Sequence, residues 1–131
     1  MKVFHYINFL MIFIFLIAIC IFEETLVSST LTLVQDECYK IENAIADKQS
    51  LKEMDIVLLV DNLEFDWIEN ESKLCYLVNH ASIKELSYEI SHLKSYLATD
   101  KIEDFKASLD AIKIYCHNYL HFMGANVHNI L

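Results

Sequence analysis

Three residues near the carboxyl terminus have types and spacing that could bind a metal or act as a nucleophile. His117 and His121 are one helical turn apart, a spacing from which two imidazoles can chelate zinc or copper. No glutamate follows His117 as it does in zincins, and the sequence supplies no third ligand. Cys116 falls on an apolar stripe and, as a helical neighbour, points about 100° away from His117. We therefore predict no metal site and no Cys–His nucleophile here.

Two acidic patterns could also attract cations. Glu89 and His92 match half of a di-iron carboxylate motif, but the sequence has no second copy. The segment from Glu53 to Glu71 holds seven acids and no base, which could attract divalent cations or a basic partner. Charge runs are more often solvated helix faces. We interpret both patterns in that way and predict no metal ligand and no cofactor.

The four cysteines do not predict a disulfide framework. Cys20 lies in an apolar amino-terminal segment, which leaves the odd number Cys38, Cys75 and Cys116 outside it. These three fit helical stripes, where a free cysteine behaves as a small hydrophobe. We favour free thiols, although an oxidising location would permit a disulfide. Since no nucleophile, base and orienting group occur together, we expect the protein not to be an enzyme.

The composition of the 131 residues favours continuous helix. Proline is absent and glycine occurs once, so the usual residues of tight turns are missing. All ten basic residues are lysine, against 19 acids, giving a net charge of −9. Because phosphate contacts need clustered basic side chains, this balance disfavours nucleic acid. It equally disfavours docking on anionic lipid.

The amino-terminal segment predicts a membrane anchor. Every residue from 9 to 22 is apolar, and the run extends back to Val3 with two interruptions. About 20 residues span a bilayer core, so residues 1–22 are just long enough. No small-x-small site follows, which favours an uncleaved signal anchor over a signal peptide. Cleavage near Thr30 remains the alternative.

Flanking charges predict the orientation of this anchor. Lys2 and the amino group precede the apolar run, and Glu23 and Glu24 follow it. Positive flanks stay in the cytoplasm. We expect a single-pass protein of the cell membrane with a cytoplasmic amino terminus and an extracytoplasmic domain at residues 23–131.

Apolar residues three and four apart predict amphipathic helices in that domain, each with one face toward a core. Three helices have one stripe each: Leu31, Val34, Cys38, Ile41 and Ile45; Ile83, Leu86, Ile90, Leu93 and Leu97; and Ile102, Phe105, Leu109, Ile112, Cys116 and Leu120. A longer helix has one stripe of Ile56, Val60, Leu63, Trp67, Leu74 and Val78, and a second on its opposite side of Leu58, Phe65, Ile68 and Tyr76. We predict that this long helix is central and covered on both sides.

Capping chemistry predicts where the helices begin and end. Two segments match the capping-box pattern: Ser50 with Glu53, and Ser82 with Glu85. Asp100 with Glu103 repeats the pattern with a carboxylate, and Gly124 is the expected terminator. The expected helices span residues 30–47, 51–79, 82–98 and 101–123. Short connections make them an all-α antiparallel bundle of about four helices after the transmembrane helix. The break near residues 28–30 is weak, so one continuous helix from membrane to domain stays open.

The second half of the chain resembles domain-of-unknown-function family 4363. The resemblance covers most of residues 35–131 and is carried by the following residues: Trp67, His80, Ile83, Ile90, Leu93, Tyr96, Leu97, Asp100 to Glu103 and Asn129 to Leu131. It implies a short, amino-terminally anchored helical protein of low-GC Gram-positive bacteria, and it implies no activity. Members are often encoded beside small multi-pass membrane proteins, which implies a membrane-protein partner.

These observations lead to one expected function and one alternative. We expect a non-enzymatic, membrane-anchored protein-interaction module whose working surface is a groove between helices or the acidic long helix. Its partner would be a membrane protein or a second copy of the chain. The alternative is an extracytoplasmic sensor that binds a metal or a small ligand through the His-bearing last helix.

Overall fold

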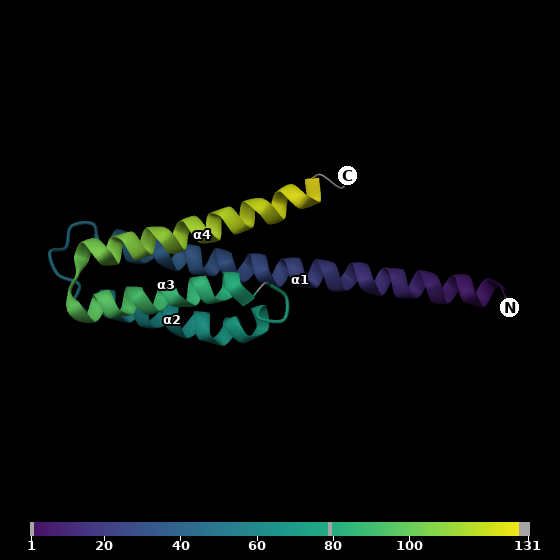
Figure 1. Cartoon of the computed structure of the whole chain (residues 1–131), viewed down its shortest axis with the longest axis horizontal. Coiled ribbons are helices and arrows are strands. Elements are labelled where there is room, and N and C mark those ends of the chain that lie inside the picture. Colours follow the sequence, from purple (N-terminus) through teal and green to yellow (C-terminus); the bar gives the residue numbers. More distant parts are fainter. Residues whose placement is uncertain (1, 79, 129–131) are drawn as a thin grey trace.

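A computed structural model shows four helices among the residues that it describes (Figure 1). The structure describes the backbone of residues 2–78 and 80–128 and the side chains of residues 4–78 and 80–122. The helices are α1 (Lys2–Ile45), α2 (Met54–Leu74), α3 (His80–Thr99) and α4 (Ile102–His128). No strand occurs within the described backbone. The predicted all-α fold class is confirmed.

Helix α1 joins the predicted anchor and the first helix of the domain. It runs for 44 residues without a break, a length of about 66 Å. Near the expected break, the Thr25 hydroxyl donates to the Ile21 carbonyl (2.7 Å) and the Ser29 hydroxyl to the Leu26 carbonyl (3.0 Å). Such bonds let hydroxyl side chains sit inside a helix. The separate helix predicted from residue 30 is wrong, and the continuous alternative is confirmed.

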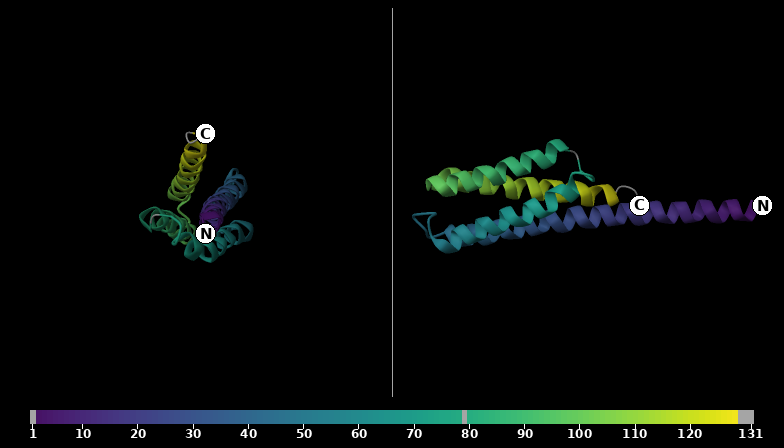
Figure 2. Two further views of the ribbon diagram at one scale, coloured as in Figure 1. Left: turned by 90° about the vertical axis from the view of Figure 1, so that its right-hand side faces the viewer. Right: turned by 90° about the horizontal axis from the view of Figure 1, so that it is seen from below.

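The amino-terminal half of α1 lies clear of the other helices (Figures 1 and 2). It contains an 18-residue window of mean hydropathy 2.5, of which only 6% is buried. By length and composition, α1 is the one helix of the described chain that could cross a membrane. The first buried side chain among those described is Val27. The bundle therefore begins within two turns of Phe22, where the predicted anchor ends.

The rest of α1 packs with α2, α3 and α4 into an antiparallel up-down-up-down bundle (Figure 2). Each helix contacts the next, α4 closes against α1, and no diagonal pair of the described helices is in contact. All predicted stripes face this core except the second stripe of the helix that became α2. The residues of the core-facing stripes are buried, apart from three half-buried residues packed against the core: Val78, Ile102 and Leu120.

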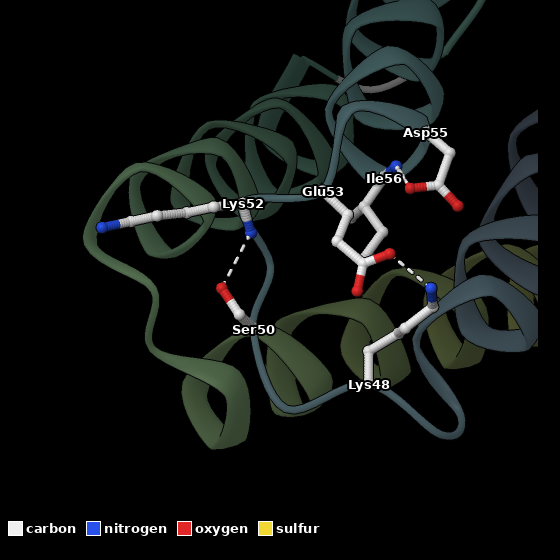
Figure 3. Close-up of polar contacts among 6 residues, drawn as sticks. All are labelled: Lys48, Ser50, Lys52, Glu53, Asp55 and Ile56. Atoms are coloured by element: carbon white, nitrogen blue, oxygen red, sulfur yellow. Dashed lines mark hydrogen bonds and ion pairs between the residues drawn. The ribbon is translucent and has the colours of Figure 1, made fainter.

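The connection from α1 to α2 departs from the predicted capping box. Helix α2 begins at Met54 rather than at residue 51, and Glu53 is its N-cap without a side-chain cap. Figure 3 shows why: the Ser50 hydroxyl accepts the Lys52 N–H within the connection (3.2 Å), and Glu53 pairs with Lys48. Both side chains of the expected box are therefore used elsewhere.

Asp100 caps the end of α3 and not the start of α4. Its φ is +56°, and the Lys101 and Asp100 amides donate to the carbonyls of Tyr96 (3.0 Å) and Leu97 (3.2 Å). This is the Schellman pattern, in which a left-handed residue closes a helix. The Asp100 carboxylate then accepts the Leu51 N–H (2.6 Å) and the Ser50 hydroxyl (3.0 Å), which lowers the pKa of Asp100. Asp100 thus joins the two connections at one end of the bundle.

Three further predicted helix ends are wrong. Helix α2 ends at Leu74 and not at residue 79. Helix α3 begins at His80, so Ser82 lies inside it and does not cap it. Helix α4 continues through Gly124 to His128. A glycine weakens a helix by about 1 kcal/mol relative to alanine but does not stop it.

Candidate functional site

Helix α2 has two apolar faces, and the bundle covers only one. The inner face is buried: Ile56, Val60, Leu63, Trp67 and Leu74. The outer face, which we call the outer stripe, consists of Met54, Leu58, Phe65 and Ile68 on α2 and of Tyr76 in the turn that follows the helix, each between 54% and 90% exposed. The prediction that α2 is central and covered on both sides is wrong. In a bundle of four helices around one core, every helix keeps a face outside.

The acids of α2 on the α3 side are held by side chains of α3. Lys94 pairs with Glu64 and lies 3.4 Å from Asp61. The Ser87 hydroxyl donates to the Glu71 carboxylate (2.7 Å). Glu64 and Glu71 are half-buried and reach across to α3, so the solvated-face interpretation is wrong for these two acids, whereas Asp61 is exposed.

Two acids on the other flank of the outer stripe have no salt-bridge partner among the described residues. At 100° per residue, Asp55 and Glu69 lie on the α1 side of the stripe. Both are exposed, and neither forms a salt bridge with a described residue. An apolar row with unneutralised carboxylates beside it suits a ligand that is apolar along its centre and basic at its edge.

Two carboxyl groups meet between α1 and α2. Glu37 is 9% exposed, and its Oε2 has no hydrogen-bond partner in the described part of the chain. Burial, a hydrogen bond with Asp66 and the charge of Asp66 raise the pKa of Glu37 to about 7, against the opposing charge of Lys40. Two carboxyl groups share a hydrogen bond only while one is protonated. The sequence analysis missed this pair because nothing local connects a residue of α1 with one of α2.

A groove of about 340 Å³ lies between α1 and α4. Its lining residues are Gln35, Tyr39, Asp110, Lys113, Ile114, His117 and Asn118. The Lys113 ammonium lies 2.6 Å from Glu42 and 2.8 Å from Asp110, and 5.4 Å from the centre of the Tyr39 ring. Burial lowers the pKa of Lys113, but the hydrogen bonds to both acids outweigh it and raise the pKa overall. The cation of this groove is therefore already neutralised.

The histidines at the rim of this groove lie together without a further ligand. The rings of His117 and His121 stack with centroids 6.5 Å apart and planes 7° apart, and both residues are exposed. Cys116 is fully buried on the core side of α4, where burial raises the pKa of its thiol to about 12. No group of three His, Cys, Asp or Glu residues that could hold a metal occurs among the described residues. The absence of a metal site remains a prediction.

The other residues singled out from the sequence lie apart from one another in the fold. Glu89 is half-buried and accepts the hydroxyl of Ser108 on α4 (2.9 Å), so its interpretation as a solvated residue is wrong. His92 is exposed beside the ring of Tyr96, with centroids 6.2 Å apart. All four cysteines are free, including the three outside the anchor for which we favoured free thiols: Cys38, Cys75 and Cys116. Burial raises the thiol pKa of Cys38 as well, which keeps it protonated and unreactive.

A comparison with known protein families matches residues 21–130 to a domain of unknown function, DUF4363. The chain belongs to the DUF4363 family. The match covers the whole bundle, and within it Trp67 and Ile83 are core residues while Asp100 joins two connections. The final segment that resembled the family, residues 129–131, lies outside the described residues. No curated protein and no solved structure matches the chain.

Proposed function

We propose that this DUF4363 protein is a non-enzymatic interaction module that α1 holds on the outer side of the cell membrane. The observation that carries the proposal is the outer stripe of α2. Four large apolar residues remain exposed in one row on α2, outside the apolar half of α1, and Tyr76 follows in the next turn. Grouped exposed apolar side chains of this kind mark interaction sites on soluble folds.

The proposed topology rests on the charges around the apolar run. Lys2 precedes it, and Glu23 and Glu24 follow it at the point where the bundle begins. A reporter that is active only outside the cytoplasm, fused after Leu131, should be active. Activity of a reporter that works only in the cytoplasm would place the module on the opposite side. The mature chain should also retain residues 1–22.

The interaction surface can be tested by photo-crosslinking in the cells that make the protein. We expect p-benzoylphenylalanine at Phe65, which is 67% exposed, to give a discrete adduct. The matched control is the same substitution at Tyr88, an aromatic residue of α3 that is 65% exposed. Equal labelling from both positions, or none from Phe65, would contradict the proposal.

A second candidate function is a small-ligand sensor built on the groove between α1 and α4. The supporting observation is the groove itself, where amide, imidazole and aromatic side chains converge. The metal form of this candidate is tested by zinc and copper calorimetry on the full chain. Stoichiometric binding that is lost in the His117→Ala/His121→Ala double variant would place the sensor ahead of the interaction module.

A further inference from the structure

We infer that the outer stripe of α2 receives an amphipathic helix of a different protein, with lysine or arginine beside its apolar row. This inference rests on the proposed function and specifies the chemistry of the partner. It follows from the shape of the stripe, from the charges beside it and from the charge of the chain as a whole.

The shape of the outer stripe matches a helix. Its four members within α2 follow one another at intervals of four, seven and three residues, which keeps them on one line of the helix. From Met54 to Ile68 this line is about 21 Å long, or about four helical turns. A row that is one side chain wide matches the contact surface of a second helix. The apolar residues of that helix, three and four apart in its sequence, would pack along the row.

The negative charges beside the outer stripe favour a basic partner. Helix α2 contains six acids and one lysine. Asp55 and Glu69 flank the stripe on the α1 side without a salt bridge among the described residues. Asp61 lies within the row itself and already pairs with Lys94 of α3. An apolar helix without basic residues would remove the carboxylates of Asp55 and Glu69 from water without supplying a positive charge to replace their hydration. Lysine or arginine at the edges of the partner helix would pair with them.

A second copy of the chain does not meet this requirement. Paired subunits most often use the same patch on both copies. Two outer stripes packed on each other would bring Asp55, Asp61 and Glu69 of one copy against the acids of the other. The chain also carries a net charge of −9, so the copies repel one another before contact. The occupant is therefore a different, basic chain.

The test is the sequence of the peptide crosslinked to p-benzoylphenylalanine at Phe65, read by mass spectrometry, with one charge reversal. We expect a peptide with apolar residues three and four apart and an excess of lysine and arginine. Glu69→Lys should lower the adduct yield about fivefold. The control is Glu85→Lys, the same charge change at an exposed residue of α3 that faces Tyr115 of α4. It should leave the yield unchanged.

The outcomes separate this inference from the proposed function. An adduct with an acidic peptide, or with a peptide of this chain, would overturn the basic partner and leave the interaction surface standing. An equal loss of adduct yield in Glu69→Lys and Glu85→Lys would also overturn the basic partner, because a general effect of charge would then explain the lower yield. No adduct at all would instead remove the proposed function on which the inference rests.

Discussion

The inner and outer faces of α2 have similar apolar content and opposite surroundings. Trp67 and Leu63 on the inner face are at most 2% exposed, whereas Phe65, between them in sequence, is 67% exposed. Burial of an apolar side chain stabilises the fold in proportion to the area removed from water. The inner face therefore contributes stability, and the outer face contributes almost none to the isolated chain. Folding therefore accounts for the apolar residues on the inner face of α2, whereas those on the outer face need another explanation, for which we propose binding.

The largest expected effect is on the inner face. Trp67→Ala should lower the free energy of unfolding by about 3–5 kcal/mol, the usual cost of deleting a buried aromatic side chain. Domains of this size are stable by about 5–15 kcal/mol, so the bundle would become marginal. Chemical denaturation of the full chain in mild detergent, followed by circular dichroism, measures the change. A loss below about 1 kcal/mol would contradict the assignment of Trp67 to the core.

The next effect concerns Glu37, whose carboxyl meets Asp66 on the flank of α2 that faces α1. The pKa of Glu37 is about 7 in the fold against an ordinary 4.5. Because the folded state holds the proton of Glu37 more tightly than the unfolded chain does, the contribution of Glu37 to stability is fully present below pH 4.5 and is lost as the pH rises through 7. Glutamine mimics the protonated acid. Glu37→Gln should therefore be more stable than the native chain above pH 7, by about 2–3 kcal/mol.

Denaturation at pH 4, 6 and 8 checks this prediction. The advantage of Glu37→Gln should vanish at pH 4 and grow through pH 6 to pH 8. The control is Glu69→Gln, an equal loss of charge at an exposed residue of α2, whose effect should stay small at every pH. Parallel profiles for the two variants would show that Glu37 titrates normally in the fold.

A smaller effect is expected at the hydrogen bond behind Trp67. The indole Nε1–H donates to the Ser87 hydroxyl at 3.0 Å. Ser87→Ala leaves this buried donor unpaired and should cost about 1–3 kcal/mol. In a Trp67→Phe background, the same change should cost less, because no indole N–H remains. Equal costs in both backgrounds, measured by denaturation, would show that the bond contributes nothing.

The sequence predicted the core well because periodicity follows from helix geometry. Leu31 to Ile45 of α1, and the stripes of α3 and α4, needed only the spacing of three and four residues to be placed. The same spacing also marks the outer stripe, however, and periodicity does not say what covers a face. The choice between one and two covered sides of α2 depended on how many helices surround it, which is a property of the whole bundle.

The helix ends were predicted less well because polar side chains have several possible partners. Ser50 and Asp100 both matched local capping patterns, but they bond to each other across the end of the bundle. The pair of Glu37 and Asp66 could not be predicted from local sequence either, because the packing of two helices brings these residues together. Local sequence identifies which groups need partners, and the fold decides which partners they receive.

The smallest effect on stability is expected at Phe65, and it gives the most direct test of the outer stripe as a docking surface. Phe65→Ala should change the free energy of unfolding by no more than about 0.5 kcal/mol, as exposed substitutions do. In the same cells, it should abolish the adduct formed by p-benzoylphenylalanine placed at Ile68, the next residue of the stripe. Tyr88→Ala on α3 should change neither quantity. A stable Phe65→Ala chain that still forms the Ile68 adduct in full would contradict the account.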